Sequence, residues 1–208
     1  MKFRASQLGK LMTSSRTKGE ALSQTAKSYI IQKAKEDFFD YKVELNNKYI
    51  LKGIHQEQDS IDLLNAVRFE NYVKYKDHRA ENEWLTGSCD IITEELIIDI
   101  KTCWSLETFP ATSYELKDLN EYEWQGRAYL WLYDRPMFEL CYVMVSTADD
   151  ILSDFDSYAI HKVDHIDPAK RITSIRFERD KELEIQMAEK LIAATAFYKE
   201  VLTQLNEK

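Results

Sequence analysis

Apolar residues recur with two different periods along the chain, and the change of period predicts a mixed α/β domain. Helical spacing predicts helices over 7–12, 20–39, 54–67, 119–133 and 180–206. Alternation or short apolar runs predict strands over 84–93, 96–103, 138–146, 158–163 and 171–178. We therefore expect a central mixed β-sheet flanked by helices.

Two charged residues interrupt the most apolar of these strands, Leu96–Cys103. Side chains alternate along a strand, so that Asp99 and Lys101 share the face of Ile97. Burying either charge alone would cost several kcal/mol, roughly, so each needs a partner. A metal ion in a water-filled cleft is one solution, and a simple Asp–Lys ion pair at a sheet edge is the alternative.

Asp90 stands nine residues before Asp99, at the end of the sequence Thr86-Gly87-Ser88-Cys89-Asp90. If the two strands form a hairpin, Asp90 lies beside Asp99, and Gly87 allows a close backbone approach. Neighbouring carboxylates repel unless a cation lies between them, and a hard ion such as Mg²⁺ prefers oxygen ligands. The alternative is that Asp90 merely ends a strand.

Glu57 is the polar member of a predicted helical face that otherwise carries Ile54, Ile61 and Leu64. Carboxylates are seldom buried on such a face without a partner. This residue therefore either contributes to a site or reaches past the edge of the face to water.

Gln125 occupies the same kind of position in the predicted helix 119–133. Its face also carries Tyr122, Tyr129 and Leu132. A buried amide needs hydrogen-bond partners, which a functional site or the backbone could supply.

Charge and cysteine content narrow the classes of protein that fit. The net charge is −8, but residues 1–35 contain eight Lys and Arg residues and one acid, Glu20, so that this segment carries +7 and the remainder −15. A basic arm on an acidic body suits a protein that binds phosphates at one edge, although a solvated helix pair would show the same pattern.

Three separated cysteines are too few for an iron–sulfur cluster. No secretory signal or membrane-spanning run is present, so we expect a cytoplasmic protein with no membrane partner.

The motifs and their order resemble those of the PD-(D/E)XK nucleases, and within them the phage lambda exonuclease and YqaJ-type viral recombinase exonucleases. The chain has Gly-x-x-x-Glu ending at Glu57, Gly-x-x-Asp ending at Asp90, Asp-x-Lys at Asp99 and Lys101, and Gln-x-x-x-Tyr beginning at Gln125. The proline that names the motif is replaced by Cys89. The resemblance covers nearly the whole chain and implies a restriction-endonuclease-like core in a single nuclease domain over 1–208. Its parts would be a basic helical part over 1–40, a catalytic core over 53–146 and a C-terminal helix over 180–206.

The resemblance also implies the roles of individual residues. Mg²⁺, with Mn²⁺ as a substitute, would be held by the side chains of Glu57, Asp90 and Asp99 and by the Ile100 carbonyl. Lys101 would position the attacking water, and Gln125 would orient a water or the substrate. The expected substrate contacts are Ser88, Tyr129 and a 5′-phosphate pocket formed by Ser14, Ser15 and Arg16, with Ser6 and Arg4 as alternatives.

The expected activity is hydrolysis of linear double-stranded DNA by an exonuclease, 5′ to 3′, in phage-type recombination. A structure- or sequence-specific endonuclease of the same fold is the first alternative, and an inactive DNA-end-binding protein is the second. Expected partners are double-stranded DNA ends and a single-strand annealing protein. Relatives often form rings around DNA, which makes a trimeric ring a hypothesis for this chain.

Overall fold

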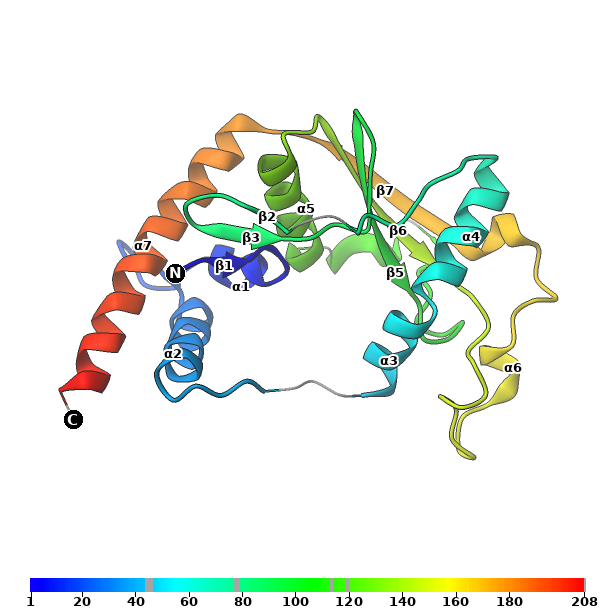
Figure 1. Cartoon of the computed structure of the whole chain (residues 1–208), viewed down its shortest axis with the longest axis horizontal. Helices are drawn as coiled ribbons and strands as arrows, with labels where there is room; N and C mark the ends of the chain where they lie inside the picture. The colour runs from blue at the N-terminus through cyan, green and yellow to red at the C-terminus, as the bar shows by residue number, and fades with distance from the viewer. Residues whose placement is uncertain (44–46, 77–78, 113, 119, 208) are drawn as a thin grey trace.

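A four-stranded mixed sheet forms the centre of the protein in the computed structural model, which describes residues 1–43, 47–76, 79–112, 114–118 and 120–207 (Figure 1). Its strand order is β4–β5–β6–β7. The strands are β4 (Ile91–Ile92), β5 (Leu96–Thr102), β6 (Met137–Val143) and β7 (Ile172–Glu178). β5 and β6 run parallel, whereas β4 and β7 pair antiparallel at the two edges.

Helices cover both faces of this sheet, as expected from the alternation of apolar residues. Ile97 of β5 belongs to a core that includes Leu130 of α5 (Asn120–Tyr133), whereas Ile98 and Ile100 belong to a second core with Ile61 of α4 (Glu57–Arg68). The mixed α/β class predicted from the sequence is therefore confirmed. No helix in the described part of the chain is long and apolar enough to cross a bilayer.

A second, smaller sheet corrects the expectation of one strand over 84–93. That segment contains two strands in different sheets, because β3 (Leu85–Gly87) pairs with β1 (Phe3–Arg4) and β2 (Ala80–Glu81), whereas β4 pairs with β5. The chain leaves one sheet and enters the other over residues 88–90. Apolar alternation alone does not reveal such a crossing between sheets.

The N-terminal region packs on the C-terminal helix. A 3₁₀ turn, η1 (Ala5–Gln7), leads into α1 (Leu8–Met12), which begins one residue later than the predicted helix over 7–12 and has no side-chain cap. α2 (Gln24–Phe38) begins later than expected, because the Ser23 hydroxyl accepts a hydrogen bond from Ala26 N and caps it. α7 (Lys181–Asn206) is capped by Asp180 as its sequence predicts, and Figure 1 shows it running beside α2.

The predicted helix over 54–67 is two helices. α3 (Lys48–His55) and α4 are separated at Gln56, whose backbone leaves helical geometry. Ile54 is 65% exposed, so the apolar face assigned to it is wrong. Residues 158–163, expected as a strand, instead contain the short helix α6 (Tyr158–His161). The remaining elements are two 3₁₀ turns, η2 (Glu115–Asp118) and η3 (Pro168–Arg171). Residue 119, the first of the predicted helix 119–133, lies outside the described residues.

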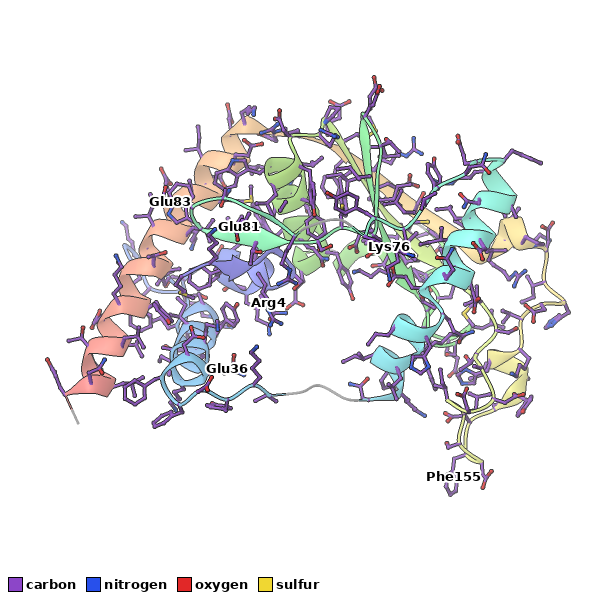
Figure 2. The ribbon with its side chains drawn as sticks, in the orientation of Figure 1. Arg4, Glu36, Lys76, Glu81, Glu83 and Phe155 are labelled. Carbon is purple, nitrogen blue, oxygen red and sulfur yellow. The ribbon has the colours of Figure 1, made fainter. Side chains whose placement is uncertain are left out.

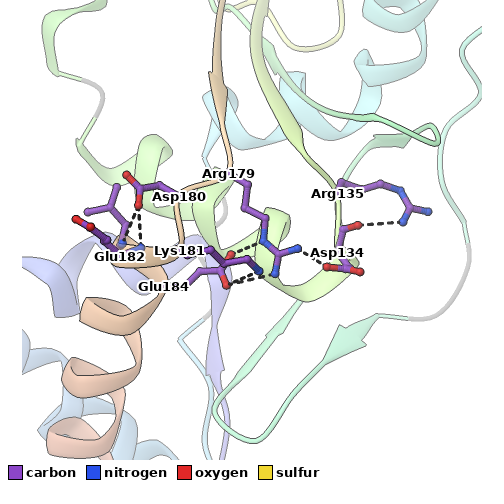
Figure 3. Close-up of polar contacts among 8 residues, drawn as sticks. Asp134, Arg135, Arg179, Asp180, Lys181, Glu182 and Glu184 are labelled. Atoms are coloured by element: carbon purple, nitrogen blue, oxygen red, sulfur yellow. Dashed lines mark hydrogen bonds and ion pairs between the residues drawn. The ribbon is translucent and has the colours of Figure 1, made fainter.

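A cluster of charges joins α5, β7 and α7 at one end of the sheet (Figure 3). Arg179 follows β7 and pairs with Asp134 at the end of α5 and with Glu184 in the first turn of α7. Asp134 has a positive φ of 52°, which stops the helix before β6. The cluster fixes where α7 leaves the sheet, and hence where it meets α2.

Candidate active site

Asp90 and Asp99 lie side by side at one end of the β4–β5 pair. The antiparallel register pairs Ile91 with Ile98, and continuing it by one residue sets Asp90 opposite Asp99. The Asp90 carboxylate accepts a hydrogen bond from Ile100 N at 2.7 Å, and this contact holds it against β5. The adjacency expected from the hairpin is therefore present, although Asp90 lies just before the short strand β4 rather than within it.

Asp99 is 3% exposed and is held from two sides. The Gln125 amide donates to Asp99 Oδ1 at 3.1 Å and to the Tyr129 hydroxyl at 3.0 Å. The Lys101 ammonium lies 2.5 Å from Asp99 Oδ2 and 4.8 Å from the centre of the Tyr122 ring. Asp99, Lys101 and Gln125 thus meet on the α5 face of the sheet, as strand and helix periodicity predict.

Glu57 reaches the same place from the other side, because it is the first residue of α4. Its charge acts on Asp90 closely enough to raise the pKa of that group. Glu57 Oε1 is 2.7 Å from the Lys74 ammonium, a contact that the sequence did not indicate. The break at Gln56 therefore places this carboxylate at a helix start rather than in the middle of a helical face.

The electrostatics confirm that these groups share one environment. The pKa of Asp90 is raised to about 7, first by burial and then by the neighbouring charges of Asp99 and Glu57, while the Ile100 N–H and the Lys101 charge oppose the rise. Burial is the largest single effect and would lower the pKa of Lys101, but the charge and hydrogen bonding of Asp99 and the charge of Asp90 together outweigh it, so that the pKa is raised. Carboxylates that repel in this way favour a bound cation.

Two buried oxygens show that the residues present suit a divalent cation. Among the described residues, three buried side-chain polar atoms have no hydrogen-bond partner, namely Glu57 Oε1, Asp99 Oδ2 and Arg171 Nε. The first two belong to expected metal ligands, and each faces an ammonium group at ion-pair distance, Lys74 at 2.7 Å and Lys101 at 2.5 Å. Within the described ranges of the chain, no group of three His, Cys, Asp or Glu side chains is arranged so that it could hold a metal ion as it stands. A hard cation takes carboxylate and carbonyl oxygens, which Glu57, Asp90, Asp99 and Ile100 offer.

The expected substrate contacts lie in different places. Ser88 is exposed between β3 and β4, next to Asp90. Tyr129 is buried, and its hydroxyl contacts Gln125.

Figure 1 shows the loop that carries residues 14–16 beside α7, away from β5. The alternatives Arg4 and Ser6 are both exposed and adjoin β3, since Arg4 pairs with Thr86. Figure 2 shows Arg4 extending from β1 on the side of α2 and α3.

Buried polar contacts of Lys52 and Gln56, which were not predicted from the sequence, fix the start of α4. Lys52 is fully buried and donates to the carbonyls of Val145 and Trp104 and to the Thr147 hydroxyl, at 2.8, 3.1 and 2.8 Å. One turn later, the Gln56 amide donates to the Ser146 carbonyl and accepts from Ala148 N. Because Glu57 follows Gln56 directly, these contacts set its position. The spacing of Lys52 and Gln56, four residues apart, could have indicated a shared buried site, but polar residues at this spacing usually lie on a solvated helix face.

Lys52 gives a prediction about alkaline stability. Burial lowers the pKa of Lys52 to about 8, from 10.5 in an unfolded chain. Between these values the unfolded state binds more protons, so this residue makes the protein more stable as pH rises from 8 to 10.5. The free energy of unfolding of wild type minus that of Lys52→Met should rise by about 3 kcal/mol over this range. Urea titrations at several pH values measure it, and a flat difference would contradict the prediction.

Gly87 gives a prediction about the support of Asp99. A Cβ at this position would lie 2.7 Å from a Tyr129 ring carbon and 2.9 Å from Ala5 Cβ. Gly87→Ala should therefore displace Tyr129 and Gln125, lower stability by about 1–3 kcal/mol and reduce activity. Melting and cleavage assays test this. Gly53→Ala is the control, since its Cβ meets nothing within 4 Å and alanine favours the helix; an equal loss in both variants would refute the steric argument.

The fold and the placement of the motif residues define a PD-(D/E)XK-type nuclease, and solved structures identify the family. The chain is similar to a phage-related exonuclease from Haemophilus somnus 129PT, with 31% identity, a TM-score of 0.92, and 99% of this chain and 96% of that chain covered. It shares the fold of the alkaline exonuclease LHK-Exo from Laribacter hongkongensis, at 15% identity and TM-score 0.73, and of LHK-Exo in complex with dAMP, at 17% and 0.72. Each comparison covers 99% of this chain and 92% of that chain.

No family model matches the sequence, and no curated protein matches it either. The identity to the Haemophilus protein over almost the full length of both chains is nevertheless sufficient to show relationship. The chain belongs to the lambda-exonuclease-like family of PD-(D/E)XK nucleases, the family that its motif order resembles.

Proposed function

We propose that the protein is a divalent-cation-dependent exonuclease that degrades linear double-stranded DNA from its ends, 5′ to 3′. The proposed cation is Mg²⁺, for which Mn²⁺ can substitute. The observation that carries the proposal is the adjacency of Asp90 and Asp99 beside Lys101, with the Glu57 charge close enough to act on Asp90. One buried oxygen each of Glu57 and Asp99 faces only an ammonium group. The membership of the exonuclease family supports it.

The side chains around this site would divide the work of phosphodiester hydrolysis. Glu57, Asp90, Asp99 and the Ile100 carbonyl would hold the cation, which acts as a Lewis acid on the phosphate and lowers the pKa of a water. Lys101 keeps its ammonium beside the carboxylates, where it can orient the attacking water and offset negative charge that develops on the phosphate oxygens. Gln125 holds Asp99 in place through its hydrogen bond at 3.1 Å.

Recognition of a DNA end requires a second phosphate site. We assign it to Arg4, Ser6 and Ser88, because β1 and η1 adjoin β3 and all three residues are exposed there. Arg4 lines a pocket of about 320 Å³ between the N-terminal segment and α2, whose lining carries the bases Lys10, Lys33 and Lys42 and the acids Glu36, Asp37 and Asp40. A guanidinium with nearby hydroxyls suits a terminal phosphate.

The decisive experiment compares linear and circular duplexes of the same sequence. With Mg²⁺, we expect mononucleotides from 5′-phosphorylated linear DNA and no cleavage of the closed circle. A label on the 5′ end should be released before one on the 3′ end. Cleavage of the circle would instead indicate an endonuclease. Binding of linear ends without cleavage, by a folded protein and in either cation, would indicate an end-binding protein.

A further inference from the structure

Lys74 is the charged residue at the site for which the expected mechanism has no role. It lies on the segment that follows α4, and this segment is fixed on both sides of it. The Asn65 side chain makes two hydrogen bonds with the backbone of Tyr72, at 2.8 and 2.9 Å, and Tyr75 N donates to the Asp90 carbonyl at 2.7 Å. The backbone of the segment therefore holds the Lys74 ammonium at Glu57.

Lys74 and Glu57 form an ion pair, with 2.7 Å between the Lys74 ammonium and Glu57 Oε1. The Lys74 side chain is 37% exposed and can move into solvent. Ion pairs of such exposed lysines contribute about 0.2–1 kcal/mol. The Lys74 ammonium can therefore be displaced at little cost.

Lys101, the other ammonium at the site, is held differently. It is less exposed, at 24%, and lies between the Asp99 carboxylate and the Tyr122 ring. The cation–π contact with the Tyr122 ring adds to its ion pair. Of the two, Lys74 is thus the one that an incoming divalent cation can replace.

We propose that Lys74 is an internal counter-ion that competes with the divalent cation for Glu57 and thereby sets the affinity of the site for that cation. The inference rests on the proposed function, because it assumes that Glu57 is a ligand. When the ion binds, Glu57 exchanges the ammonium for the metal, and Lys74 moves away from the carboxylates.

Calorimetric titration with Ca²⁺, which reports binding without cleavage, tests this on the full-length protein. Lys74→Met should bind Ca²⁺ more tightly than wild type by up to about fivefold, the upper end of what an exposed ion pair allows. Lys76→Met is the matched control. This change removes the same charge two residues away, and the Lys76 side chain is exposed (Figure 2). We expect the control to change the affinity by less than twofold.

A double-mutant cycle separates a direct contact from a general charge effect. In a Glu57→Gln background, Lys74→Met should give no gain beyond that of Lys76→Met. Equal gains in the two lysine variants, or weaker binding in Lys74→Met, would overturn the inference. If Asp99→Asn leaves Ca²⁺ binding unchanged, the proposed cation site itself fails, which is a different result from a site that binds Ca²⁺ but ignores Lys74.

Discussion

Asp99→Asn should lower Mg²⁺-dependent cleavage of linear duplex DNA on the order of 10³-fold while DNA binding persists. Loss of a ligand that supports a Lewis-acid ion removes several kcal/mol of transition-state stabilisation, and about 1.4 kcal/mol corresponds to a factor of ten in rate. Asparagine keeps the shape of the side chain and an oxygen that accepts from Gln125. Single-turnover cleavage and a filter-binding assay measure the two properties separately.

The control for this variant is Asp150→Asn, which makes the same chemical change in an exposed loop. It should cleave DNA at the wild-type rate. Thermal melting of both variants checks that each is folded. Cleavage by Asp99→Asn at more than a tenth of the wild-type rate would show that the catalytic carboxylates lie elsewhere.

Strand periodicity made part of this site readable from sequence. Asp99 and Lys101 share a face of β5 because side chains alternate along any strand, and this holds whatever packs around it. Gln125 and Tyr129 share a face of α5 for the equivalent helical reason, and their hydrogen bond at 3.0 Å confirms it. Local geometry of this kind survives folding, so residues related by it are predictable.

Glu57 shows the limit of such reasoning. Its helical face was inferred together with Ile54, yet the helix breaks at Gln56 and Ile54 is exposed. The break depends on two hydrogen bonds of the Gln56 side chain, which donates to the Ser146 carbonyl and accepts from Ala148 N, about ninety residues away. A contact at that separation leaves no periodic trace in one sequence. The position of Glu57 therefore follows from tertiary structure, although its motif had marked it.

The contacts of Lys74 and Lys52 were not predictable for a related reason. Both lysines were unremarkable in a chain with 28 Lys and Arg residues. Their partners come from distant elements, namely the start of α4 for Lys74 and the loops after β5 and β6 for Lys52. The crossing from β3 to β4 was also hidden, since both halves of that segment alternate as one strand would.

The far end of α4 is anchored by a buried carboxylate. Glu139 of β6 is fully buried, and it accepts hydrogen bonds from Arg68 at the end of α4 and from Arg176 of β7. Burial alone would raise the pKa of Glu139, but hydrogen bonds from Arg68 and Ser174 and the charges of the two arginines outweigh it and lower the pKa. Arg68 thus ties α4, the helix that begins at Glu57, to the sheet.

Glu139→Gln should therefore lower the free energy of unfolding by about 3–5 kcal/mol at pH 7, because the arginines lose their buried counter-charge. A lowered pKa means that this stabilisation is complete above the unfolded pKa near 4.5 and is lost as pH falls through the lower folded value. The difference between wild type and variant should accordingly shrink below about pH 4.5. Urea unfolding at pH 7 and pH 3 measures it. Glu178→Gln changes an exposed residue of β7 and should show neither effect. If Glu139→Gln lowered the free energy of unfolding equally at both pH values, lost packing rather than lost charge would explain the destabilisation.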